Sequence, residues 1–286
     1  MVTARTAGTT DGERENMADD QVALVTGATG TIGKAIAAEL GARGAALMLT
    51  GRRKDALDDV AAELRERGAR VETAVGDVTD PAHAEDAVAR AAEAFGPITT
   101  LVNNAGGASA IGTSVADSDP LAWRETLLVD TYGPYLFAHA VLPSMLRERR
   151  GRIITVASRA GTAAIPGASD YVVAKTAVLR LAENIAVETR GTGVVAFSLH
   201  PGGILTRLNE EQVRRGLIPR ERFPDSPEAA ARMVGELAGG RYDVLSGAFL
   251  DVGDDLAALA GQRTDEPTRV LRVVDLPEPF TARPMY

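Results

Sequence analysis

The sequence contains no cysteine. This absence excludes disulfide bonds, thiolate metal sites and cysteine nucleophiles. Histidine is scarce as well, because its three copies, His83, His139 and His200, are scattered along the chain and indicate no cluster of metal ligands. We therefore expect no bound metal, and any catalysis must rest on other oxygen and nitrogen side chains.

The chain also lacks an apolar run long enough to span a bilayer, and its N-terminus lacks the apolar core of a secretory signal. Its formal net charge is −8, and no basic stripe with interleaved aromatic residues is present. That charge pattern argues against a nucleic-acid partner. We expect a cytoplasmic protein that binds neither membranes nor nucleic acid.

Lysine occurs only at positions 34, 54 and 175, although Lys and Arg together number 31. Nearly every basic residue is therefore Arg, a bias typical of bacterial genomes rich in G and C. A lysine in such a chain stands out as a position where a compact ammonium is required.

Short apolar segments alternate with amphipathic ones from residue 21 onward. Strands are expected at 22–26, 45–50, 71–75, 98–103, 152–157, 194–199 and 247–252. Helices are expected at 34–43, 55–68, 82–95, 120–147, 169–190 and 226–238. This alternation predicts an α/β fold with a single Rossmann-like, doubly wound parallel sheet of about seven strands and helices on both faces.

Composition predicts the limits of the folded domain. Residues 1–19 are polar, small and aperiodic, so we expect a disordered extension. Residues 20–259 form the Rossmann-like domain, with no linker or repeat inside it. Residues 260–286 are rich in Pro, Arg and acidic side chains, and we expect this tail to lie on the surface or on a neighbouring subunit.

The first expected strand runs directly into a glycine-rich loop and a helix. Glycines permit a tight turn and close approach of the backbone to a pyrophosphate, and a helix N-terminus offers N–H groups and a positive dipole end. A glycine-rich turn without a ligand is the alternative, but this order of elements favours a dinucleotide site. The expected contacts are Gly27, Thr29, Gly30, Thr31, Ile32 and Gly33.

The end of the second strand favours NADP over NAD. NAD sites place an acidic residue there for the ribose 2′-hydroxyl, whereas arginine accommodates a 2′-phosphate. Here Arg52 and Arg53 offer two guanidiniums and no carboxylate. The alternative is that both arginines only solvate the start of a helix.

The segment after the fifth strand carries the candidate catalytic residues. Tyr171 and Lys175 are four residues apart and would share one face of a helix. A nearby ammonium favours the ionised form of a phenol, and Ser158 could stabilise charge on the same substrate oxygen. A surface pair is the commoner explanation of Tyr-x-x-x-Lys, but the scarcity of lysine favours a chemical role.

Together these motifs resemble the short-chain dehydrogenase/reductase family over roughly residues 21–255. The resemblance implies that Tyr171 is the general acid/base, that Lys175 tunes it and binds the nicotinamide ribose, and that Ser158 polarises the carbonyl. It implies a homo-oligomer, either a tetramer or a dimer. Further cofactor contacts implied by the resemblance are Asp77, Val78, Asn104, Ala105, Gly106, Pro201, Gly202, Ile204 and Thr206.

The chain departs from this family at three motifs, of which the end of the last strand (246–255) is only similar to the usual Val-Asp-Gly-Gly and concerns the subunit contacts. Its glycine spacing, Gly27-x-x-Gly30-x-x-Gly33, is similar to a longer, sugar-modifying branch, whereas Asn103 to Gly106 and the compact length favour the reductase branch. Asp130 replaces the usual Asn of the catalytic set. A unit charge at ~8 Å and an effective dielectric of ~20 is worth roughly 2 kcal/mol and would oppose ionisation of Tyr171. We expect a protonated or Lys-paired Asp130 or an activity optimum at higher pH; a harmless structural variant is the alternative.

These features predict an NADP-dependent ketoreductase acting on a small-molecule ketone or alcohol, possible alternatives being an elimination or epimerisation enzyme and an NADP-binding regulatory protein. The sequence does not identify the substrate, although specialised bacterial metabolism fits the composition. Residues 207–225 are expected to form a mobile lid. We interpret His200, Trp123 and Tyr135 as structural.

Overall fold

The computed structural model describes residues 20–109, 111–214, 216, 218–262 and 270–271. The predicted disordered extension, residues 1–19, and most of the predicted tail lie outside these described residues. Within them, no helix is both long and apolar enough to cross a membrane.

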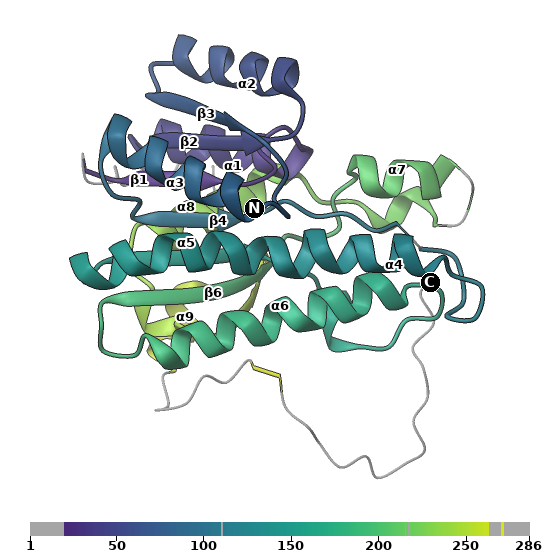
Figure 1. Ribbon diagram of the computed structural model, residues 1–286. Helices are drawn as coiled ribbons and strands as arrows, with labels where there is room; N and C mark the ends of the chain where they lie inside the picture. The colour runs from purple at the N-terminus through teal and green to yellow at the C-terminus, as the bar shows by residue number, and fades with distance from the viewer. Residues whose placement is uncertain (1–19, 110, 215, 217, 263–269, 272–286) are drawn as a thin grey trace, which may run out of the picture.

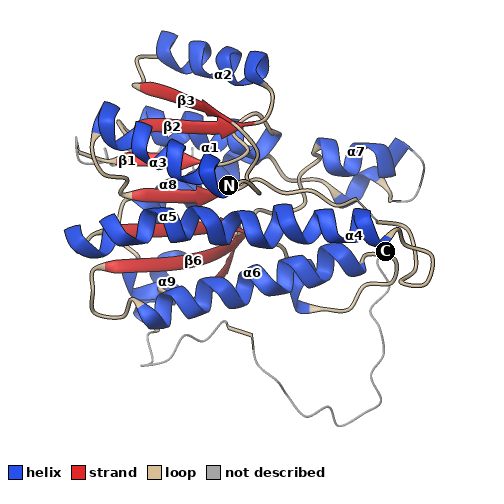
Figure 2. Ribbon diagram, in the orientation of Figure 1, coloured by secondary structure: helices blue, strands red, loops and turns tan. Residues whose placement is uncertain are grey.

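Seven parallel strands form one sheet in the order β3-β2-β1-β4-β5-β6-β7. The strands are β1 (Val22–Val25), β2 (Ala46–Gly51), β3 (Val71–Val75), β4 (Thr100–Asn103), β5 (Gly151–Val156), β6 (Val194–His200) and β7 (Phe249–Asp251). The strand order reverses between β1 and β4, and ligands of such sheets bind beyond the carboxyl ends of the strands at this switch point. Figure 2 shows the strand arrows pointing to one common edge. The predicted fold class is confirmed.

Helices cover both faces of the sheet (Figure 1). One face carries α1 (Thr31–Ala42), α2 (Lys54–Glu66), α8 (Pro227–Ala238) and α9 (Leu256–Gly261). The other carries α3 (Pro81–Phe95), α5 (Gly133–Glu148) and α6 (Ser169–Glu188). Figure 1 shows α4 (Pro120–Leu127) and α7 (Arg207–Arg214) on the side where the strands end, which is the side of the expected ligand site.

The strands are apolar at successive positions because both faces of the sheet are covered. Ala23 and Val25 of β1 pack in the core beneath α1 and α8, whereas Val22 and Leu24 pack beneath α3 and α5. Neighbouring side chains of a strand point to opposite faces, so a strand buried on both sides is largely apolar, and buried polar residues within it, such as Thr50, Thr100 and Ser198, are small.

The expected helix at 120–147 differs from the observed structure. A π-helical turn, η1 (Leu128–Tyr132), separates α4 from α5. Such turns insert an extra residue into the helix and are frequent at functional sites, and this one contains Asp130. The predicted boundary at residue 259 falls inside α9, so the folded part continues to Gly261.

One described residue of the predicted tail lies on α6. The N–H of Leu271 donates to Glu183 Oε1 at 2.6 Å, and its carbonyl accepts from Arg180 Nη2 at 2.9 Å. Its side chain packs against Ala157, Val178 and Leu179. At this point the tail follows the surface of its own domain.

Candidate active site

The glycine-rich loop between β1 and α1 has the geometry of an anion site. Gly27 has φ +64°, and a Cβ at Gly33 would lie 2.3 Å from the Gly27 carbonyl oxygen. Gly27 and Gly33 are therefore required by close backbone packing. Gly30 is exposed and is the N-cap of α1, where no side chain caps the helix and no acidic residue occupies the first turn. The N–H groups and positive end of α1 fit a phosphate group.

The loop after β4 is fastened to the glycine-rich loop. Thr26 Oγ1 accepts the backbone N–H groups of Asn104 and Ala105, each at 3.0 Å. The Asn104 Nδ2 in turn donates to the carbonyls of Thr26 (3.0 Å) and Gly27 (3.2 Å). The predicted residues Asn104 and Ala105 thus lie beside the predicted phosphate site, and Gly106 follows toward Asp130 and Lys175.

The residues expected at the adenosine end meet at the ends of β2 and β3. Arg52 Nη1 lies 3.7 Å from Asp77 Oδ2, and the Arg52 side chain is 70% exposed. Burial favours a higher pKa for Asp77, but hydrogen bonds from Thr79 and the Arg52 charge outweigh it and lower the pKa. Arg53 is the exposed N-cap of α2. The Arg52 guanidinium and an ionised Asp77 carboxylate therefore lie together at the surface, and Val78 packs against Gly133.

Tyr171 and Lys175 lie on one face of α6, with Lys175 Nζ 5.5 Å from the centre of the Tyr171 ring. Ser158 follows β5 and begins a short 3-10 turn, η2 (Arg159–Thr162), where its Oγ accepts the Ala160 N–H at 3.1 Å. This turn is fixed to α6, because Thr176 Oγ1 donates to the Gly161 carbonyl at 2.9 Å. The structure thus joins the turn that begins at Ser158 to the part of α6 that carries Lys175.

Asp130 forms a buried ion pair with Lys175. Its Oδ2 lies 3.0 Å from Lys175 Nζ, and its Oδ1 accepts the Gly107 N–H at 2.6 Å. Burial raises the pKa of Asp130, although Lys175 and the Gly107 N–H act in the opposite direction. Burial alone would lower the pKa of Lys175, but the Asp130 carboxylate reverses this, and the net direction is upward. Lys175 is therefore protonated at neutral pH, and of the arrangements expected for Asp130 the Lys-paired one is observed.

Asp225 holds the segment that is expected to contact the nicotinamide through two hydrogen bonds with Gly203. The Gly203 N–H donates to Asp225 Oδ2 at 2.7 Å, and the Asp225 N–H donates to the Gly203 carbonyl at 2.9 Å. Gly202 has φ +93° and Pro201 is buried. Thr206 precedes α7 and is held by Asn209, whose side chain accepts the Thr206 N–H and donates to the Ile204 carbonyl. The predicted lid, residues 207–225, thus begins as a capped helix.

Three residues lie near the site although no sequence motif indicates a functional role for them. Gly107 supplies the N–H to Asp130, and Asp170 is buried directly before Tyr171, where Thr126 Oγ1 donates to it at 2.7 Å. Trp123, interpreted as structural, also lies here, because its Nε1 donates to Ser169 Oγ at 3.1 Å.

His200, also interpreted as structural, accepts the Arg159 N–H at Nδ1 (3.4 Å). Burial lowers the pKa of His200.

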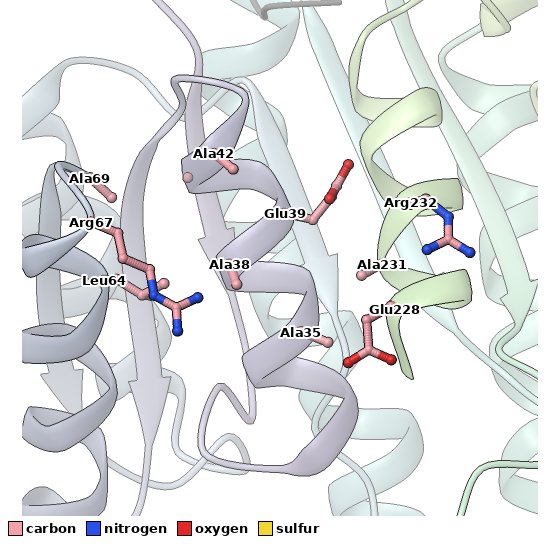
Figure 3. Close-up of a pocket in the computed structure, with 11 residues that line it drawn as sticks. Ala35, Ala38, Glu39, Ala42, Leu64, Arg67, Ala69, Glu228, Ala231 and Arg232 are labelled. Atoms are coloured by element: carbon pink, nitrogen blue, oxygen red, sulfur yellow. The ribbon is translucent and has the colours of Figure 1, made fainter. Parts of the chain in front are cut away.

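The hollow in Figure 3 is separate from these residues. It measures about 300 Å³ and lies between α1, α2 and α8, on the sheet face opposite α6. Small side chains of α1, including Ala35, Ala38 and Ala42, form its floor, and Arg67 and Arg232 border it. It contains none of the predicted site residues. Among the described residues no group of three potential metal ligands is present.

Comparison with known proteins gives a consistent picture. Residues 21–215 match the family model described as short chain dehydrogenase. The chain is 34% identical over 247 residues to a protein named granaticin polyketide synthase putative ketoacyl reductase 1 from Streptomyces violaceoruber, covering 84% of this chain and 89% of the relative. It is 32% identical over 251 residues to a short chain dehydrogenase from Monascus purpureus, covering 85% and 84%.

A solved structure shares the fold. A variant of actinorhodin polyketide ketoreductase, crystallised with NADPH, superposes with a TM-score of 0.75 at 28% identity, covering 82% of this chain and 96% of that one. The matched region includes the glycine-rich loop, Ser158, Tyr171 and Lys175. The chain therefore belongs to the short-chain dehydrogenase family of oxidoreductases, as its sequence motifs predict.

Proposed function

We propose that the protein reduces a ketone to a secondary alcohol with NADPH, or catalyses the reverse oxidation. The observation that carries this proposal is the buried Lys175 ammonium beside Tyr171, on the helix to which the Ser158 turn is fixed. A bound nicotinamide would supply or accept the hydride. The glycine-rich loop fits such a cofactor, because its uncapped helix N-terminus and close-packed glycines form a phosphate cradle.

Tyr171, Ser158 and Lys175 have different roles in the proton transfer. In the reductive direction, the Tyr171 hydroxyl gives its proton to the substrate carbonyl oxygen as the carbonyl carbon gains the hydride. Ser158 Oγ already accepts the Ala160 N–H, so its own proton is free to donate to the same oxygen. The Lys175 ammonium stabilises the phenolate left on Tyr171, and bulk water restores the proton.

NADPH is the proposed cofactor because of Arg52 and Arg53. We expect Arg52→Ala and Arg53→Ala each to raise KM for NADPH about 10-fold, the loss of roughly one charge-assisted hydrogen bond. KM for NADH should stay within about twofold, since NADH has no 2′-phosphate. Steady-state kinetics with both cofactors measures this. Arg67→Ala, an exposed arginine at the end of the same helix, is the control, and equal losses for both cofactors would contradict the assignment.

The proposed substrate is a ketone of bacterial specialised metabolism. One similar protein is named a polyketide synthase putative ketoacyl reductase and another a polyketide ketoreductase, which supports a polyketide-type ketone. The test is oxidation of NADPH against a panel of ketones, with identification of the alcohol formed. One alcohol per NADPH consumed is the expected result. NADPH binding without turnover of any ketone or alcohol would favour the regulatory alternative.

One observation favours a second candidate, a regulatory protein that binds NADP without turnover. Asp130 offsets the Lys175 charge and so weakens the activation of Tyr171 as an acid/base. A third candidate, elimination or epimerisation with the same tyrosine, would give a product at the same oxidation state as its substrate, with NADPH not consumed.

We further propose a homo-oligomer, a dimer or tetramer, in the cytoplasm. Large apolar side chains are exposed on α5 and α6, among them Tyr135 (45%), Val173 (45%) and Val187 (64%). A second copy could cover this face. Light scattering of the full chain measures the number of copies.

A further inference from the structure

A buried carboxylate lies directly beside the proposed general acid. Asp170 precedes Tyr171 in the first turn of α6, and its exposed fraction is 0%. Thr126, on α4, is 1% exposed and donates from Oγ1 to Asp170 Oδ2 at 2.7 Å. A carboxylate without contact to water is costly unless donors meet it. The Thr126 hydroxyl thus supplies a hydrogen-bond donor to the buried Asp170 carboxyl group.

The direction of the hydrogen bonds around Thr126 is fixed. Its Oγ1 accepts the Ser109 N–H at 2.9 Å. The single hydroxyl proton could be given to the Ala122 carbonyl at 3.4 Å or to Asp170 at 2.7 Å. The contact with Asp170 is shorter by 0.7 Å (2.7 against 3.4 Å) and has the length of a normal O–H···O bond, so the proton is given to Asp170. A directed chain therefore runs from Ser109 through Thr126 to Asp170.

A second contact joins the same two helices one residue away. Trp123 Nε1 donates to Ser169 Oγ at 3.1 Å, so α4 holds two adjacent residues of the turn that carries Tyr171. The loop after β4 also reaches Lys175, because the Gly107 N–H binds Asp130. One loop, through Gly107 and Ser109, is therefore linked to both members of the Tyr171–Lys175 pair.

We propose that Asp170 and Thr126 are positioning residues for catalysis. They fix the first turn of α6 against α4 and the loop after β4, and so hold the Tyr171 hydroxyl at the place where the substrate carbonyl must bind. The inference rests on the proposed role of Tyr171 as proton donor. It adds two residues that do not touch the reacting atoms themselves but determine where the donor lies.

The test compares Thr126→Val with Thr126→Ser in the full chain. Valine has nearly the same shape but lacks the hydroxyl, so kcat per NADPH-binding site should fall about 10-fold, since small misplacements of a catalytic group are costly. The Kd for NADPH should stay within about twofold. Serine restores the hydroxyl and should recover at least half of the wild-type kcat. Thr126→Ala removes the same hydroxyl without an added methyl group and replaces valine if that variant folds poorly.

Thr189→Val is the matched control, because Thr189 is a buried, hydrogen-bonded threonine at the far end of α6. It should lose stability without losing kcat. Equal kcat for Thr126→Val and wild type, an equal loss in Thr189→Val, or no recovery in Thr126→Ser would overturn the proposal.

Amide hydrogen exchange tests this inference independently of the proposed function. Loss of the Thr126 hydroxyl frees the Ser109 N–H, so Thr126→Val should speed amide exchange at Ser109 and in the first turn of α6 at least 10-fold. Unchanged exchange at both places would overturn the link even if the enzyme is active. Faster exchange in a protein that reduces no ketone would show instead that the link exists and that the proposed reaction is wrong.

Discussion

Replacement of Tyr171 by Phe should lower kcat for ketone reduction by about 10³-fold, within the range that a positioned acid or base contributes. The variant loses only the phenolic hydroxyl. This hydroxyl makes no hydrogen bond within the described part of the chain, so its removal leaves no buried partner unsatisfied. The Kd for NADPH and the midpoint of thermal unfolding should therefore stay close to wild type. Stopped-flow or steady-state oxidation of NADPH, with a binding titration, measures these quantities.

Tyr242→Phe is the control for this substitution. Tyr242 is a buried tyrosine in the core on the opposite face of the sheet, so its replacement should leave kcat unchanged. A Tyr171→Phe enzyme with wild-type kcat would show that another group donates the proton. If wild type and variant both bind NADPH and neither consumes it, the regulatory alternative gains support.

The glycine-rich loop and its place between a strand and a helix could be predicted from the sequence because the signals are local. An apolar strand, glycines and a helix follow one another without interruption from Val22 to Ala42, so each local pattern supports the prediction of the next element. The same holds for Tyr171 and Lys175, whose spacing places them on one helix face. The alternation of strands and helices was sufficient for the sheet and its two covered faces.

The contact between Asp130 and Lys175 could not be predicted with its geometry. The two residues come from different helices, and Asp130 reaches Lys175 from a π-helical turn that interrupts an otherwise regular helical pattern. The extra residue in such a turn has no fixed sequence signature. The hydrophobic periodicity of residues 120–147 therefore predicted one continuous helix.

Asp170 shows a second limit of sequence reasoning. An acidic residue in the first turn of a helix is ordinarily explained by the helix dipole and by exposure to water. Its burial arises only when α4 packs against α6 and brings the Thr126 hydroxyl to it. Tertiary packing thus converts an unremarkable helix residue into part of the site.

Asp130→Asn should move the pH profile of the reaction downward. Oxidation of an alcohol requires Tyr171 to accept a proton, so the rate of oxidation should rise with pH. In the wild type this occurs beside an ion pair whose charges offset each other, whereas in the variant only the Lys175 ammonium remains. At ~8 Å and an effective dielectric of ~20 the removed charge is worth roughly 2 kcal/mol, or about 1.5 pH units.

The sign of this shift follows from charge alone and applies to both directions. Reduction requires a protonated Tyr171, so its decline at alkaline pH should begin at lower pH in Asp130→Asn than in wild type. The Asp130 charge thus favours proton donation by Tyr171 and disfavours proton acceptance by it. Rate measurements across pH in both directions test this.

Asp243→Asn provides the matched control, because Asp243 pairs with Arg152 at 2.7 Å near the opposite end of β5 from Ser158. Its pH profile should coincide with that of wild type. An unchanged profile in Asp130→Asn would mean that the carboxylate at 130 carries no charge that Tyr171 senses, either because it is protonated or because Lys175 screens it fully. A shift confined to Asp130→Asn would instead assign the buried carboxylate a part in setting the protonation of Tyr171, the proposed proton donor.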